Sequence, residues 1–137
     1  SLPDHSAFVN YVRCHDDIGW GFDENKEREI GIDPLLHKIY QYRFWAGDFP
    51  CSYAQGDLYN YDCRTLDART VGTTASLIGL GNAKSSAEEE NAIRRFRLIY
   101  STVFALKGLP LINSGDEIGM LNDEEYINVP QKRNDSR

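Results

Sequence analysis

Three consecutive residues, His15, Asp16 and Asp17, are the best candidates for chemistry in this sequence. They closely follow the apolar segment FVNYV at 8–12, which predicts a short buried strand. Alternate side chains at a strand end point to opposite faces, so one carboxylate can enter a pocket while its neighbour is directed elsewhere. Carboxylates stabilise the positive charge that develops as a glycosidic bond breaks, and an imidazole can donate a hydrogen bond to a sugar hydroxyl. A metal site and a solvated turn are alternative interpretations of the same residues.

A second acidic pair, Asp116 and Glu117, follows the apolar segment 109–113, which also predicts a short strand. The pair is an alternative candidate for acid–base catalysis. We do not favour it, because adjacent side chains at a strand end diverge and cannot flank one bond.

The elements that would position these residues form a strand–helix–strand pattern. The clearest helix is predicted to begin at Ser86, because Ser86 and Glu89 have the spacing of a capping box, and to end before Gly108. Its apolar residues recur at helical spacing: Ile93, Phe96, Ile99, Tyr100, Val103 and Phe104. Two strands joined through a helix predict a right-handed crossover in a parallel sheet, and therefore the α/β fold class.

A long insertion, residues 18–80, separates the first strand from this helix. It is predicted to be mostly helical, with a short helix near 24–29, a helix that begins at Asp33-Pro34 and ends near Gly47, and another over 70–80. Residues 48–68 are irregular, with short strand pieces and several aromatic residues. Long structured loops after barrel strands are where barrel enzymes build substrate sites.

The stretch FVNYVRCHDDIGW resembles the fourth conserved sequence region of the α-amylase superfamily (glycoside hydrolase family 13), at the end of the seventh barrel strand. The resemblance implies that His15 binds the sugar next to the cleaved bond and that Asp16 is the third catalytic carboxylate. The extra Asp17 and the following Ile-Gly-Trp resemble the amylosucrase branch, with Cys14 where that branch usually has serine.

Two further stretches carry the same resemblance. Residues 108–119 (GLPLINSGDEIG) resemble the eighth strand and the signature after it, a position that the family uses mainly for shape and hydrogen bonding. Residues 67–77 (DARTVGTTASL) resemble the stretch that places an arginine on the acceptor side of the pocket, here Arg69 near Asp17. Residues 134–137 resemble the start of the loop after the eighth strand. Residues 48–66 depart most from the amylosucrase pattern, which leaves hydrolysis and glucosyl transfer both open.

The resemblance implies a partial (β/α)8 barrel over residues 1–137: strand 7, the insertion at 18–80, and helix 7, strand 8 and the following loop at 81–137. It implies part of a retaining enzyme that cleaves or transfers α-glucosyl units of sucrose, α-glucan or maltooligosaccharides. The nucleophile and general acid/base lie on earlier strands of the family, so the chain alone is expected to be inactive. In isolation it is expected to be predominantly helical and to self-associate through exposed barrel edges. The alternative is a non-catalytic carbohydrate-binding or interaction module derived from a barrel.

Composition excludes several other classes. The net charge of −6 over 137 residues argues against a nucleic-acid partner, which requires a basic surface. No stretch is apolar enough to span a membrane, and no signal peptide is visible. Three cysteines without a CxxC motif indicate reduced thiols and a cytoplasmic location. No cofactor is implied and no metal ligands are assigned, since no cluster of oxygen ligands suits calcium.

Overall fold

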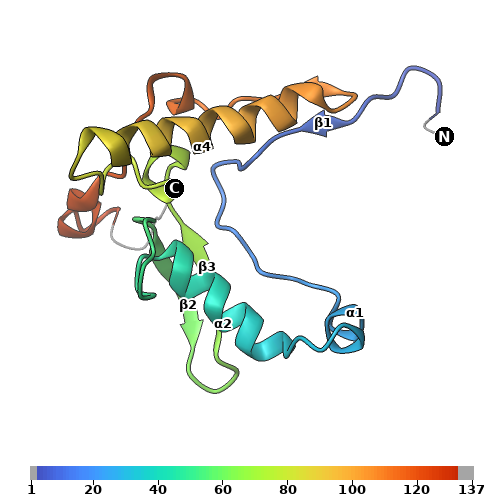
Figure 1. Ribbon diagram of the computed structural model, residues 1–137, viewed down its shortest axis with the longest axis vertical. Helices are drawn as coiled ribbons and strands as arrows, with labels where there is room; N and C mark the ends of the chain where they lie inside the picture. Colours follow the sequence, from blue (N-terminus) through green and yellow to red (C-terminus); the bar gives the residue numbers. More distant parts are fainter. Residues whose placement is uncertain (1–2, 133–137) are drawn as a thin grey trace.

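The computed structural model describes residues 3–132, so the stretch 134–137 noted above lies outside the described residues. The elements follow in the order β1 (Val9–Asn10), α1 (Glu24–Glu29), α2 (Pro34–Trp45), β2 (Asp57–Asp62), β3 (Asp67–Val71), α3 (Thr74–Leu77), α4 (Ser86–Ala105), β4 (Leu109–Pro110) and two 3₁₀ helices, η1 (Asp116–Ile118) and η2 (Glu124–Asn128). Figure 1 shows α4 with β1 alongside it above, and α2 with the β2–β3 pair below.

The two strands that flank the longest helix pair in parallel. Val9 lies opposite Leu109 and Asn10 opposite Pro110. The Leu109 amide donates to the Phe8 carbonyl over 2.8 Å, and the Leu111 amide donates to the Asn10 carbonyl over 2.8 Å. The predicted parallel pairing is therefore confirmed, although each strand is shorter than the predicted 8–12 and 109–113. Within residues 3–132 this sheet has two strands, and no closed barrel is formed there.

Helix α2 forms where its local signals predict. The Asp33 side chain accepts from the Leu36 amide over 2.9 Å and Pro34 occupies the first turn, where no backbone donor is lost. The helix ends at Trp45, and Gly47 follows the C-cap Ala46 with a φ of +82°, which favours glycine; a Cβ there would also lie 2.6 Å from the Ala54 carbonyl oxygen. The short helix α1 also has the predicted bounds, Glu24–Glu29.

The insertion is not mostly helical, because β2 and β3 form an antiparallel hairpin within it. The helix predicted over 70–80 is wrong at its start: Thr70 and Val71 belong to β3, and α3 begins at Thr74 with Thr73 as its N-cap. β-Branched residues favour an extended strand here. Gly72, with φ of +153°, separates the strand from the helix. Over the described residues, more positions lie in helices than in strands.

Helix α4 begins at Ser86, as predicted, but its cap differs from the predicted one. Ser85, not Ser86, is the N-cap, and its hydroxyl accepts from the Glu88 amide over 3.3 Å. The Glu88 carboxylate in turn accepts from the Lys84 amide over 2.7 Å. The predicted capping box at Ser86 and Glu89 is therefore wrong by one position, because both serines have a glutamate three residues later.

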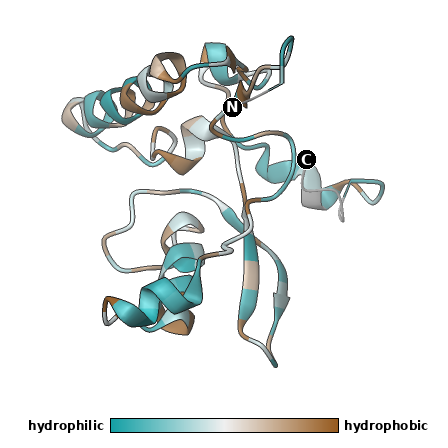
Figure 2. Cartoon of the chain, turned by 90° about the vertical axis from the view of Figure 1, so that its right-hand side faces the viewer, coloured by the Kyte–Doolittle hydropathy of each residue, from teal (hydrophilic) through white to brown (hydrophobic). Residues whose placement is uncertain are grey.

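The core lies where α3, the hairpin and α4 meet. Its buried apolar side chains are mostly small or medium in size, with two tyrosines among them: Tyr42, Ala54, Ala68, Val71, Ala75, Leu77, Ile78, Ala92, Tyr100 and Val103. Many apolar side chains on α4 and on or beside β1 and β4 stay exposed, including Phe8 (61%), Leu109 (61%) and Phe104 (55%). Figure 2 shows apolar residues interspersed with polar ones along the helices. Among the described residues, no helix combines the length and apolar character that crossing a bilayer requires.

Candidate functional site

The segment 13–18, which follows β1, is held at both ends. At its start, the Arg13 guanidinium lies 4.0 Å from the Asp116 carboxylate, and both side chains are nearly buried. At its end, Ile18 forms an isolated antiparallel bridge with Thr70 of β3, with backbone hydrogen bonds of 2.8 and 3.0 Å. Trp20 adds a hydrogen bond from its indole nitrogen to the Thr70 hydroxyl over 3.0 Å. The hairpin thus fixes the polar segment against the insertion.

This bridge brings two of the predicted site residues together. Arg69 Nη1 donates to Asp17 Oδ2 over 2.7 Å, although 52 positions separate the two residues in the sequence. The Asp17 side chain is largely buried, whereas the Arg69 side chain is 57% exposed. The hydrogen bond from Asp17, followed by its negative charge, raises the pKa of Arg69 further above its ordinary value. The pair is a charge-assisted contact with donors left over for a ligand.

His15 and Asp16, the other two predicted site residues, lie beside each other at the surface. His15 Nε2 is 3.6 Å from Asp16 Oδ2, and the two side chains are 68% and 50% exposed. Cys14 precedes them and is partly buried. One ligand atom from each of Cys14, His15 and Asp16 lies within 4.8 Å of the others.

A buried polar cluster around Asp116 was not predicted from the sequence. Asp116 is 3% exposed, and its Oδ2 accepts from the Thr74 hydroxyl over 2.7 Å and from the Tyr100 hydroxyl. Burial, followed by the hydrogen bond to Asp116, raises the pKa of Tyr100 above its ordinary value. The only sequence signal was Tyr100 within an apolar stripe, because a buried tyrosine hydroxyl needs a partner. Glu117 points elsewhere, and its side chain accepts from the Gly115 amide over 2.8 Å.

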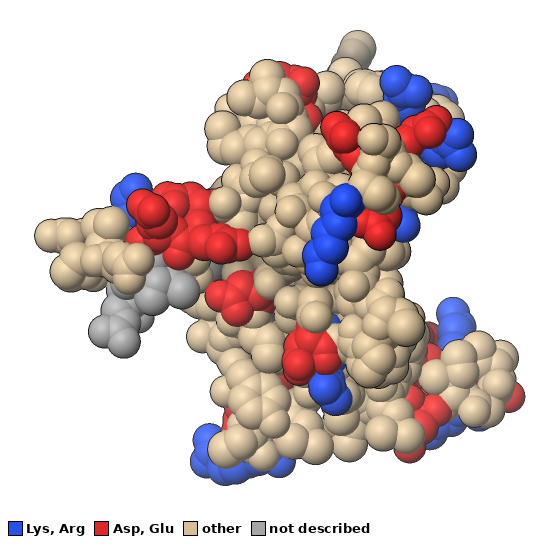
Figure 3. Space-filling model, turned by 60° about the vertical axis from the view of Figure 1, so that its left-hand side comes forward, with Lys and Arg blue, Asp and Glu red and all other residues tan. Residues whose placement is uncertain are grey.

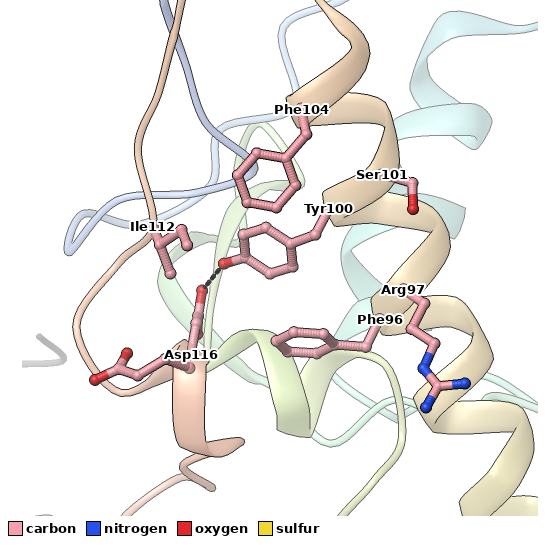
Figure 4. A pocket seen from close by; sticks show the side chains of 8 residues that line it. Phe96, Arg97, Tyr100, Ser101, Phe104, Ile112 and Asp116 are labelled. Carbon is pink, nitrogen blue, oxygen red and sulfur yellow. Dashed lines mark hydrogen bonds between the residues drawn. The ribbon is translucent and has the colours of Figure 1, made fainter.

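Figure 4 shows how this cluster borders a small cavity of about 320 Å³. Phe96, Tyr100 and Phe104 project from α4 toward the segment that carries Ile112 and Asp116. The cavity wall is therefore mainly apolar, and of its two carboxylates, Asp116 and Glu117, the first is already bonded to Tyr100. The described contacts give Asp116 a structural role, joining α3, α4 and the start of the segment 13–18.

A larger and more polar cavity of about 570 Å³ lies next to that segment, with Arg13 in its wall. The opposite wall comes from the chain after β4, including Asn122, Asp123 and Tyr126. Asn122 fixes this chain, because its side chain accepts from the Thr73 amide and donates to the Gln55 carbonyl, each over 2.7 Å. None of the four predicted site residues lines this cavity. The sequence signalled only an aperiodic polar stretch here.

On the face shown in Figure 3, lysine and arginine side chains lie in separate small groups interleaved with acidic ones. A scan against models of known protein families finds none that matches this chain.

Proposed function

We propose that this chain is part of the catalytic barrel of a retaining, α-glucan-active enzyme of the α-amylase superfamily, close to the amylosucrase branch. In this role the pair β1 and β4 corresponds to two neighbouring barrel strands. The polar segment 13–18 then forms part of the substrate-binding edge. Active sites of barrel enzymes lie at the C-terminal ends of parallel strands, which is where both polar segments of this chain begin.

The bond between Arg69 and Asp17 is the observation that carries the proposal. It joins a half-exposed arginine of the insertion to a largely buried aspartate next to the candidate catalytic residue, although 52 positions separate the two in the sequence. The contact holds a planar guanidinium on Asp17, the residue after the candidate catalytic Asp16, where its remaining N–H groups can donate to sugar hydroxyls. This is the acceptor-side arrangement that the resemblance implies.

Each residue then has a separate role in the proposed site. Asp16 stabilises the oxocarbenium-like charge on the glucosyl ring, and His15 donates a hydrogen bond to a hydroxyl of the same ring. Asp17 and Arg69 contact the acceptor, which is water in a hydrolase or a sugar in a transglycosylase. The proposal involves no cofactor and assigns no resident metal. Sucrose and maltooligosaccharides are the proposed substrates, and the cytoplasm is the proposed location, which suits three free thiols.

We propose that the chain alone does not turn over substrate. A retaining mechanism uses two carboxylates about 5 Å apart that flank the bond. Asp17 is engaged by Arg69 and Asp116 is buried under Tyr100, which leaves Asp16 as the accessible carboxylate of segment 13–18. The nucleophile and the acid/base would come from other strands of the complete barrel.

Two measurements on the chain test this proposal. In NMR titrations of the isotopically labelled chain with maltotriose and with sucrose, we expect saturable shifts at 14–17 and at Arg69. The double variant His15→Ala, Asp16→Ala should lose these shifts, while Glu117→Gln, a change at an exposed glutamate, should keep them. Shifts that persist in the double variant would refute the site. The absence of saturable shifts in the wild-type chain would refute it as well. Turnover of nitrophenyl glucoside above the double variant would refute the dependence on other strands.

A second candidate is a non-catalytic carbohydrate-binding or interaction module. The exposed His15–Asp16 pair favours it, because a single accessible carboxylate suits binding better than bond cleavage. It predicts the same NMR shifts but no product even when the complete parent domain is assayed. If the complete domain forms product and the Asp16→Asn variant of that domain does not, the enzyme is supported over the binding module.

A further inference from the structure

We propose that Cys14, His15 and Asp16 together form a binding site for a borderline-soft divalent cation, of which Zn²⁺ is the best match. The three residues are consecutive, and one ligand atom from each lies within 4.8 Å of the other two. A thiolate, an imidazole and a carboxylate are the three side-chain donors that zinc binds in proteins. The three residues follow β1 on a segment that is anchored at Arg13 and Ile18.

The distances need only small adjustment to coordinate a metal. With bonds of about 2.1 Å to nitrogen and oxygen, two ligand atoms of a tetrahedral zinc site lie about 3.4 Å apart. His15 Nε2 and Asp16 Oδ2 already lie 3.6 Å apart. The exposed His15 and Asp16 side chains can turn toward the Cys14 sulfur without disturbing a core. The protein supplies three ligands, and water completes the fourth position.

The donor set selects the class of cation. Calcium and magnesium prefer six or more oxygen ligands, and the cluster offers one carboxylate. A thiolate with an imidazole favours zinc and its spectroscopic substitute cobalt. The two nearby guanidinium groups do not oppose a cation, because Arg13 faces Asp116 and Arg69 is bonded to Asp17.

The cation would occupy the side chains that bind the glucosyl ring, so it would compete with the saccharide. This consequence rests on the proposed function, whereas the metal site itself does not. Titration with Co²⁺ or Zn²⁺ alone tests the metal site, and its outcome is independent of any sugar.

Cobalt titration of the chain tests the site. The double variant Cys51→Ser, Cys63→Ser removes the two exposed thiols and leaves Cys14 as the remaining cysteine. In this background we expect Co²⁺ to give thiolate charge-transfer absorption in the near ultraviolet, and Zn²⁺ to abolish it by displacement. A further Cys14→Ser change should remove the charge-transfer band, and His15→Asn should weaken Co²⁺ binding at least tenfold.

Circular dichroism shows whether each variant keeps the fold. If Cys14→Ser unfolds, the His15→Asn variant still tests the site. The absence of thiolate absorption from the folded background protein would overturn the proposal. So would unchanged Co²⁺ affinity in the folded His15→Asn variant, or a charge-transfer band that survives Cys14→Ser.

Discussion

Asp116 lies in the stretch 108–119, which resembles a family signature, and its observed contacts are structural. Its carboxylate accepts from hydroxyls on α3 and α4, Thr74 and Tyr100, and faces the Arg13 guanidinium at the start of the candidate site. Glu117, next in the chain, is exposed and bonds to a local backbone amide. The two adjacent acids therefore have different environments and cannot act as a catalytic pair on one bond.

Replacement of Asp116 by asparagine should destabilise the protein by about 2 kcal/mol, because an amide oxygen that accepts from both hydroxyls leaves the NH₂ group facing the Arg13 guanidinium in place of a carboxylate oxygen. The matched variant Glu117→Gln should change the free energy of unfolding by less than about 0.5 kcal/mol. Urea unfolding followed by circular dichroism measures both. Equal losses for the two variants would contradict the assignment of Asp116 as the buried anchor.

Tyr100 gives a pH dependence with a defined sign. Its folded pKa is raised above the unfolded value of 10.0, mainly by burial and then by the bond to Asp116. The folded state therefore keeps the phenol proton when the unfolded state loses it. The stabilisation is fully present below about pH 10 and declines as pH rises above it, by at most about 1.4 kcal/mol per pH unit.

The measurement is the difference in unfolding free energy between wild type and Tyr100→Phe over a pH series, in which ionisation of other tyrosines and lysines cancels. We expect this difference to stay constant up to about pH 10 and then to shrink. A difference that grows with pH would show that the sign is wrong.

At the scale of elements, the sequence predicts the N-cap of a helix correctly where it offers a single capping residue. Asp33-Pro34 and Gly47 define α2 without competition. Ser85 and Ser86 each precede a glutamate by three residues, so the sequence could not choose between them. The Asp116 cluster escaped prediction because it depends on a pairing between distant residues, Thr74 and Asp116, 42 positions apart. The hairpin β2–β3 is local, but its strands, DLYNYD and DARTV, are polar and lack a clear apolar alternation. The contact between Arg69 and Asp17 was expected only through the family resemblance.

The two serines provide a direct test of the observed start of α4. Ser85→Ala should cost about 1 kcal/mol, because it removes the acceptor for the Glu88 amide. Ser86→Ala, at the first helical residue, should stay within about 0.5 kcal/mol of wild type, since alanine has the better helix propensity. Thermal and urea unfolding of the two variants would measure this. If Ser86→Ala lost more stability than Ser85→Ala, the result would contradict Ser85 as the N-cap and support the capping box at Ser86 and Glu89.

At the scale of the whole molecule, the most informative feature is the apolar surface around β1 and β4. Phe8 and Leu109 are each 61% exposed, and each strand of this pair has one edge without a partner strand. Such strands invite pairing with another chain. In a complete barrel, further strands and helices would cover this surface.

In the chain alone, we expect a second copy to cover it. The sedimentation coefficient should rise with protein concentration, and Leu109→Glu should suppress this rise because it places a charge on the apolar face. Leu36→Glu is the control, since Leu36 is equally exposed (66%) but lies on α2, away from the strand pair. A wild-type sedimentation coefficient independent of concentration would contradict self-association.

The central claim is that the Asp16 carboxylate faces a glucosyl ring and stabilises positive charge as its bond breaks. The most direct test is a saccharide-bound crystal structure of the complete catalytic domain that contains this chain. The account predicts an Asp16 carboxylate oxygen within about 3.5 Å of the ring bound next to the cleaved bond. A bound saccharide that Asp16 does not contact would contradict the account.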